Sequence, residues 1–155
     1  MMGLSHEFEG TLSWTGQVSQ ADGKLRLDRE YLIEFRDKAP LAGSSPEVFK
    51  GDDSKHNPET LMVSSLMACH HLTYVSMCER AGIAMTGYED RAVGALERKD
   101  GKIRMVNVTL HPRVRVHDAS QLAQATAMHQ SAHEECFMAN SVNFEVLVQP
   151  EVSAG

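Results

Sequence analysis

The sequence lacks the long apolar run that a membrane-spanning helix needs. No uninterrupted apolar stretch approaches the roughly 20 residues that cross a bilayer. The opening residues, MMGLSHEFEG, also lack the basic start and the apolar core of a secretory signal peptide. We therefore expect a cytoplasmic protein.

A surplus of basic residues is also absent. Lys and Arg number 15 against 21 Asp and Glu, which gives a formal net charge of −6. A protein that binds nucleic acid without regard to sequence needs the opposite balance, because its cations must meet phosphates. The remaining composition, 42% hydrophobic and 23% charged, is ordinary for a globular protein, and 155 residues suit one domain. We expect a single domain over residues 1–155.

Cysteine is scarce, with three residues at Cys69, Cys78 and Cys136. Three is an odd number, and a reducing compartment keeps thiols free, so the pattern does not indicate a framework of structural disulfides. Each cysteine is then either a reactive thiol or a buried one.

The first third of the chain has the period of two that is typical of strands. Apolar and polar residues alternate from Phe8 to Trp14 and again from Leu25 to Phe35, and Ala21-Asp22-Gly23 offers a turn between them. A loop rich in Gly, Ser and Pro is expected from Ala39 to about Lys55. The sequence as a whole contains no internal repeat or low-complexity tract.

A long helix is the clearest prediction. Asn57 is a good N-cap, Pro58 suits the first helical position, and the charge of Glu59 matches the helix dipole. The chain then runs without Gly or Pro to about Arg80, and Gly82 is a plausible stop. Most of the helix circumference is apolar, so we expect the helix to be central and largely buried.

The remaining elements complete an α+β order. Two strands, Tyr88 to Leu96 and Ile103 to Val116, are expected to meet at an Asp100-Gly101 hairpin turn. A second helix is predicted from about Ser120 to Cys136, and an alternating strand from Val142 to Val148 closes the chain. Strands, helix, hairpin, helix and strand in this order predict an α+β fold.

Helix geometry separates two of the cysteines. Each residue of a helix turns by about 100°, and Cys78 lies nine residues after Cys69, so their side chains point in roughly opposite directions. We interpret Cys78 as buried filler, because free cysteine is among the most buried residue types. Cys69 and Cys136, each taken alone, have the same interpretation. Cys136 follows the polar run His133-Glu134-Glu135, which favours greater exposure.

A metal site is disfavoured by the histidine spacing. The pairs His70-His71 and His129…His133 could join the two outer cysteines around zinc, but adjacent residues of a helix point about 100° apart. The sequence also has no Cys-x-x-Cys or His-Glu-x-x-His pattern. We therefore expect no catalytic metal.

Two motifs resemble those of the OsmC/Ohr family. The stretch NPETLMVSSLMACHHLTYVSMC, residues 57–78, resembles the family's hallmark helix, in which Asn-Pro-Glu precedes a cysteine among small residues. Glu59 and Cys69 are 10 residues apart, which is the family's spacing. HEECFMANSVNFEV, residues 133–146, resembles its second cysteine motif. The resemblance extends from about Leu12 to Val148, and it implies antiparallel sheets around a long buried central helix in an intertwined homodimer, with the site at the subunit interface.

The resemblance also implies an activity, the thiol-dependent reduction of hydroperoxides. It implies organic hydroperoxides as substrates and a role in oxidative-stress defence. Cys69 would be the thiol that attacks peroxide and becomes a sulfenic acid. Cys136 would condense with it to a disulfide, which a dithiol reductant, lipoyl-type or other, must reduce. This cycle needs no metal or organic cofactor.

Family members activate the thiol with an Arg held by the Glu of the Asn-Pro-Glu motif, and Glu59 matches that Glu. The sequence departs from the Ohr pattern at the Arg, because Thr15-Gly16 is followed by Gln17 and Val18. Arg26, Arg29 and Arg36 remain as candidates. Arg36 is favoured because EFRDKAPLAGSSPEVFKGDD, residues 34–53, resembles a stretch of the OsmC-like branch that shares the SWTG start.

The missing Ohr-type Arg leaves alternatives open. The scaffold could hold a small apolar or thiol-reactive ligand without turning it over, as a binding protein. It could also be a structural dimer whose three cysteines are only core filler. Equal, slow alkylation of all three thiols would indicate the structural dimer.

Overall fold

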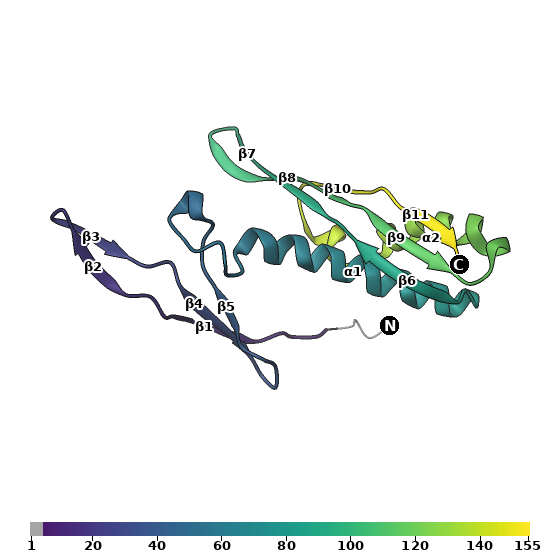
Figure 1. Ribbon diagram of the computed structural model, residues 1–155, viewed down its shortest axis with the longest axis horizontal. Coiled ribbons are helices and arrows are strands. Elements are labelled where there is room, and N and C mark those ends of the chain that lie inside the picture. Colours follow the sequence, from purple (N-terminus) through teal and green to yellow (C-terminus); the bar gives the residue numbers. More distant parts are fainter. Residues whose placement is uncertain (1–4) are drawn as a thin grey trace. The chain divides into compact units, whose positions relative to one another are not determined.

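The computed structural model describes residues 5–155, drawn in Figure 1. The chain divides into two compact units, one ending at Thr60 and the other beginning at Leu61. The prediction of one domain over residues 1–155 stays a prediction, and each unit is described by itself.

The first unit is built from short antiparallel strands. One three-stranded sheet has the order β1-β4-β5, and β2 pairs with β3 in a separate hairpin. Asp22 and Gly23 close that hairpin with φ angles of 53° and 70°, as the predicted turn requires. The bounds are β1 Gly10–Trp14, β2 Val18–Ala21, β3 Lys24–Leu27, β4 Tyr31–Phe35 and β5 Leu41–Gly43, followed by the 3₁₀ turn Glu47–Phe49.

The predicted loop from Ala39 to Lys55 contains more structure than the sequence indicated. Strand β5 and the 3₁₀ turn both lie inside it. β5 is only three residues long and pairs with β4. A strand this short forms because a neighbouring strand pairs with it, and it is too short to show a period of two in the sequence.

Helix α1, Pro58–Ala81, begins and ends where the sequence predicts. The Asn57 Oδ1 accepts a hydrogen bond from the Thr60 N–H at 2.8 Å, which satisfies one of the free donors of the first turn. At the other end Gly82 adopts φ 67°, the left-handed conformation that commonly terminates a helix. Both end signals are confirmed.

The expectation that α1 is largely buried is wrong for the single chain. One side is covered, and its buried residues are Leu66, His70, Tyr74, Met77 and Cys78. Another side carries Leu72, which is 65% exposed, and Met62, which is 41% exposed. The second unit supplies cover for only one face of the helix, and apolar composition alone does not supply a partner for the other.

The second unit contains two three-stranded sheets, of order β10-β8-β7 and β11-β9-β6. Figure 1 shows α2 beside β9 and β11, near the end of the chain. The strands are β6 Met85–Asp90, β7 Val93–Lys99, β8 Lys102–Leu110, β9 Pro112–Val116, β10 Glu145–Val148 and β11 Glu151–Ala154. The helices are α2 Leu122–Glu135 and the 3₁₀ turns Ala119–Gln121 and Ala139–Ser141.

Each of the two long strands predicted here is divided in the structure. The stretch Tyr88–Leu96 covers parts of β6 and β7, and Ile103–Val116 covers parts of β8 and β9. The second division falls at His111-Pro112, where Pro112 has no N–H to continue a ladder. The Asp100-Gly101 turn between β7 and β8 is confirmed, with φ angles of 52° and 76°.

The end of the chain also differs from the prediction. Beyond the expected final strand there is a second one, so that β10 and β11 follow each other. Both pair in parallel, β10 with β8 and β11 with β9, whereas the other strand pairs are antiparallel. The alternation of apolar residues is the same in both kinds of pairing, so it could not show the direction.

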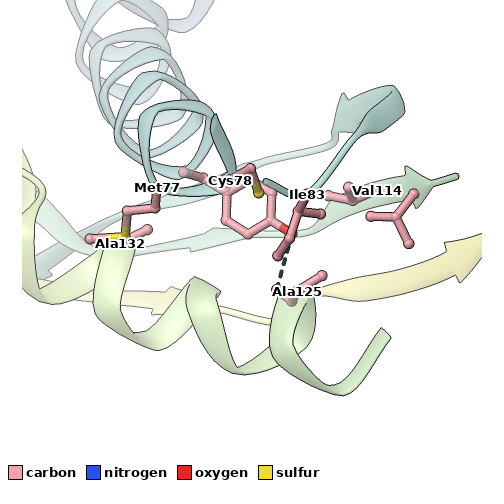
Figure 2. Packing of buried hydrophobic residues seen from close by; sticks show 8 residues of the cluster. Met77, Cys78, Ile83, Val114, Ala125 and Ala132 are labelled. Carbon is pink, nitrogen blue, oxygen red and sulfur yellow. Dashed lines mark hydrogen bonds between the residues drawn. The ribbon is translucent and has the colours of Figure 1, made fainter. Parts of the chain in front are cut away.

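Two apolar clusters hold the second unit together. One, shown in Figure 2, joins α1, α2 and β9. Within it the Tyr74 hydroxyl donates a 3.0 Å hydrogen bond to the Ala125 carbonyl. The other joins α1 to β8 and β10 through Leu66, Val108 and Val146. The α+β class is thus confirmed. Among residues 5–155, no helix has both the length and the apolarity that a bilayer crossing requires.

Candidate active site

Cys69 lies in the middle of α1, and its side chain is partly buried. The Thr73 hydroxyl, one turn later, donates to the Cys69 carbonyl at 2.9 Å. The Cys69 sulfur itself accepts a hydrogen bond from the backbone N–H of Met138, with a nitrogen–sulfur distance of 3.5 Å. The segment after α2 therefore reaches the Cys69 thiol.

Cys136 is the residue at which α2 ends. Its backbone leaves the helix with φ −70° and ψ 112°, and its N–H still bonds to the His133 carbonyl. The side chain is only 1% exposed, so the expectation of greater exposure than Cys69 is wrong. The chain after Cys136 turns back, and the Ala139 N–H donates to the Cys136 sulfur at 3.4 Å. This turn of the chain covers a thiol that the polar residues before it had led us to expect at the surface.

The two outer cysteines meet, and both are free thiols. The pKa of the Cys136 thiol is raised to about 11, first by burial and then by the neighbouring Cys69 thiol. Cys136 is therefore a neutral thiol near neutral pH, next to Cys69. Sequence spacing alone could not predict that two thiols 67 residues apart lie close together.

Cys78 lies elsewhere, as helix geometry predicted. Its side chain is buried in the cluster of Figure 2, and its thiol lies 3.7 Å from the Met128 sulfur. Burial raises the pKa of the Cys78 thiol, which disfavours the reactive thiolate. The prediction that Cys78 is buried is confirmed.

A buried histidine pair beside the thiols was missed as a feature of the site. His70 Nε2 and His129 Nδ1 are 3.0 Å apart, and the His129 ring stacks on Tyr74 with ring centroids 3.9 Å apart. Burial lowers the pKa of His70 to about 4 and that of His129 to about 3, so both rings are neutral at pH 7. His70 directly follows Cys69, and the sequence had suggested both histidines only as possible metal ligands.

No metal-binding group accompanies these histidines. His71 faces Tyr88 instead, with ring centroids 4.3 Å apart. Within residues 5–155 no cluster of three or more His, Cys, Asp or Glu side chains has the geometry to hold a metal ion.

Glu59 and Arg36 both belong to the first unit. Glu59 lies in the first turn of α1, and its Oε2 is buried without a hydrogen bond to any residue from 5 to 155. Burial raises the pKa of the Tyr31 hydroxyl, and the charge of Glu59 adds to that rise. Arg36 directly follows β4 and is exposed. In the described part of the chain these two residues form no ion pair with each other.

The other two candidate arginines are exposed as well. Arg26 lies within β3, and Arg29 follows that strand and donates to the Leu27 carbonyl at 2.8 Å. The choice among Arg26, Arg29 and Arg36 stays a prediction.

Comparison with known proteins places this arrangement in a family. A sequence profile described as OsmC-like protein matches residues 51–151. A solved OsmC-like protein of unknown function from Vibrio cholerae is 31% identical, with a TM-score of 0.84 over 95% of this chain and 100% of its own. A comparison with curated proteins found no match.

More distant solved structures share the fold. An organic hydroperoxide resistance protein OsmC from Legionella pneumophila is 19% identical, with a TM-score of 0.71 over 97% of this chain and 99% of its own. An organic hydroperoxide resistance protein from Elizabethkingia anophelis is 18% identical, with a TM-score of 0.71 over the whole of both chains. With the profile match over about two thirds of its length, the chain belongs to the OsmC-like protein family.

Proposed function

We propose that this protein is a cysteine-based peroxidase that reduces hydroperoxides, organic ones above all, and so acts in defence against peroxides. The observation that carries the proposal is the contact between Cys69 and Cys136. A partly buried thiol in hydrogen-bond contact with a second, neutral thiol is what a two-cysteine redox cycle needs. The two hydroperoxide resistance proteins that share the fold support the choice of substrate.

The chemistry runs in two steps. The Cys69 thiolate attacks one peroxide oxygen, the O–O bond breaks, and the alkoxide leaves and takes a proton from water to become an alcohol. Cys69 is then a sulfenic acid. The Cys136 sulfur attacks the Cys69 sulfur, the S–O bond breaks, and water leaves with the Cys136 proton. A dithiol, lipoyl-type or other, takes the disulfide back to two thiols by exchange.

Glu59 and Arg36 are proposed to support the Cys69 thiolate. A free thiol, with a pKa of about 8.5, is mostly protonated at neutral pH, so a cation near the sulfur would accelerate attack. The unpartnered Oε2 of Glu59 supports a role in holding such a cation, because a buried carboxylate oxygen without a donor is costly. Arg36 is the preferred source of that cation.

The protein is proposed to act as a homodimer. Among residues 5–60 only Gly43 and Ser44 are buried, so the first unit has almost no core of its own. An exposed apolar surface of this extent is typical of a protein interface. Its exposed large apolar residues are Phe8, Leu12, Trp14, Val18, Leu25, Leu27, Phe35, Val48 and Phe49. A second copy is the partner that would cover this surface and the exposed Leu72 of α1.

The peroxidase proposal is tested by mixing reduced protein with cumene hydroperoxide or hydrogen peroxide in a stopped-flow instrument. Mass spectrometry then locates any disulfide. We expect fast oxidation by the organic peroxide and a Cys69–Cys136 disulfide. Cys69→Ser should abolish the fast phase, Cys136→Ser should keep it and stop at the sulfenic acid, and Cys78→Ser should match the wild type. Oxidation no faster than that of an ordinary free thiol would overturn the proposal.

A binding protein of the same fold is the second candidate. Two observations favour this alternative: Arg36 is exposed, and within residues 5–155 it forms no ion pair with Glu59. The expected activating cation is therefore not held by that carboxylate. Tight retention of a small apolar ligand, together with unreactive thiols in the stopped-flow experiment, would support it.

A further inference from the structure

The turn that follows α2, residues Cys136–Ser141, holds its shape through its own hydrogen bonds. The Asn140 N–H donates to the Cys136 carbonyl at 3.0 Å, and the Ser141 N–H donates to the Met138 carbonyl at 3.1 Å. The Ser141 hydroxyl donates to the Phe137 carbonyl at 2.6 Å, and the Asn140 side chain donates to the Glu134 carbonyl at 3.0 Å. These bonds fix the backbone of a segment that belongs to no strand or long helix.

Two consecutive N–H groups of this turn are left for the thiols. The Met138 N–H points to the Cys69 sulfur at 3.5 Å, and the Ala139 N–H points to the Cys136 sulfur at 3.4 Å. Each N–H group places a positive partial charge against one of the two sulfurs.

The hydrogen bonds form a directed chain that ends on Cys69. The Ala139 and Met138 N–H groups donate to the sulfurs of Cys136 and Cys69 respectively. The raised pKa of Cys136 favours its thiol as the donor towards Cys69. Each donor polarises the next in such a chain. The Cys69 sulfur thus accepts from two donors of the same turn, and both bonds strengthen when that sulfur is a thiolate.

We propose that the Cys136–Ser141 turn stabilises the Cys69 thiolate, with the Met138 N–H and the Cys136 thiol as its two donors. Cys136 then has a role before peroxide arrives as well as its role in forming the disulfide. This inference rests on the proposed function for its biological purpose. Its physical content, a more acidic Cys69 thiol because of this turn, is measurable without any peroxide.

The raised pKa of Cys136, about 11, agrees with this assignment. A thiol that remains protonated near neutral pH keeps its proton available for donation. Two thiols of equal acidity in contact would instead compete for the same role.

The test measures the rate of Cys69 alkylation by iodoacetamide from pH 5 to pH 10, with mass spectrometry to separate the Cys69 peptide from those of Cys78 and Cys136. The variant Met138→Pro removes the N–H, and the φ of −71° at this residue suits proline. We expect the pH midpoint of alkylation to rise by about one unit and the rate below the midpoint to fall about tenfold. Met138→Ala keeps the N–H and should keep the wild-type midpoint.

A second variant covers the case in which Met138→Pro does not fold. Replacing the amide at Met138 by an ester, through semisynthesis with an α-hydroxy acid, removes the same N–H and leaves the chain otherwise unchanged. An ester also weakens the Phe137 carbonyl as an acceptor, and Ser141→Ala controls for that, because it removes the bond to this carbonyl and keeps the Met138 N–H. A midpoint in the folded ester protein equal to that of Ser141→Ala overturns the role of Met138.

The Cys136 donor is tested by a matched pair. Cys136→Ala removes the donor and should raise the Cys69 midpoint, whereas Cys136→Ser retains a hydroxyl donor and should raise it less. Equal midpoints in the two variants overturn the role of the Cys136 thiol. If the midpoints move as expected and hydroperoxides still react slowly, the peroxidase proposal fails while the role of the turn stands.

Discussion

His70 on α1 and His129 on α2 share a 3.0 Å hydrogen bond between Nε2 and Nδ1, and both rings are almost fully buried. The bond joins the two helices that carry Cys69 and Cys136. His129 lies seven residues before Cys136, two turns away on nearly the same side of α2. The histidine pair therefore fixes the relation of the two helices close to the thiols, and its protonation state is a matter of fold stability.

The free energy of unfolding should depend on acid through this pair. In the unfolded chain both histidines have a pKa of about 6.5, whereas burial lowers the pKa to about 4 at His70 and about 3 at His129. Above pH 6.5 the histidine pair does not make the free energy of unfolding depend on pH. As the pH falls from about 6.5 towards 4, the two histidines bind protons in the unfolded state but not in the folded state. The free energy of unfolding therefore falls. Urea unfolding at pH 7, 6 and 5 measures this slope.

The matched variants are His129→Leu and His117→Leu. His129→Leu removes one titrating ring and should flatten the slope, and it should also cost about 1–3 kcal/mol at pH 7 because it leaves the His70 Nε2 without its partner. His117 is exposed, so its replacement should leave both quantities almost unchanged. A slope in His129→Leu as steep as in the wild type would contradict the assignment.

Arg36 should be distinguishable from the other two arginines of its unit. If Arg36 supplies the charge that assists Cys69, Arg36→Ala should slow the first oxidation step by about tenfold or more, since a charge-assisted contact is worth about 1.5–3 kcal/mol. Arg26→Ala and Arg29→Ala, which replace exposed residues of the same unit, should leave that step unchanged. The rate of sulfenic acid formation under excess peroxide is the measurement. A selective loss in Arg26→Ala or Arg29→Ala would move the role to that residue.

The N-cap of α1 makes a separable prediction about stability. Asn57→Ala removes the oxygen that accepts the Thr60 N–H, and it should lower the free energy of unfolding by about 1 kcal/mol. Asn57→Asp keeps an acceptor there and should recover most of the loss. Chemical denaturation of the two variants measures the difference, and equal losses would show that the cap bond contributes nothing.

The C-terminal end of α1 depends on a backbone conformation. Gly82 has φ 67°, and a Cβ built there meets no atom within 4 Å, so the cost of Gly82→Ala comes from the backbone alone. We expect a loss of about 1–2 kcal/mol, the usual cost of the left-handed conformation for a residue with a Cβ. Gly82→Asn should lose less, because Asn tolerates this region better. Thermal unfolding of both variants decides the matter.

Cys78 provides a prediction about selectivity among thiols. It is buried, and burial raises its pKa, so its alkylation in the folded protein should be far slower than that of Cys69. In 6 M guanidinium the three cysteines should react at similar rates. Rapid alkylation of Cys78 in the folded protein would show that the core around Tyr74 opens readily.

The elements whose boundaries were predicted well are those with local chemical causes. Asn57 caps α1 through a neighbour three residues away, Gly82 ends it by its own φ, and Asp100-Gly101 forms a two-residue turn. The predictions that failed needed knowledge of distant partners. The division of the strand at His111-Pro112 and the parallel pairing of β10 with β8 depend on which segments meet in the sheet.

For the site, the sequence by itself determined which residues carry sulfur, that Cys69 and Cys78 point to opposite sides of one helix, and which family motifs surround them. Only the tertiary structure decided that Cys136 is buried, that it contacts Cys69, and that the Met138 N–H reaches the same sulfur. The reason is physical. Helix periodicity orients side chains only along one segment, whereas burial and thiol contacts depend on how α1, α2 and the following turn pack against one another.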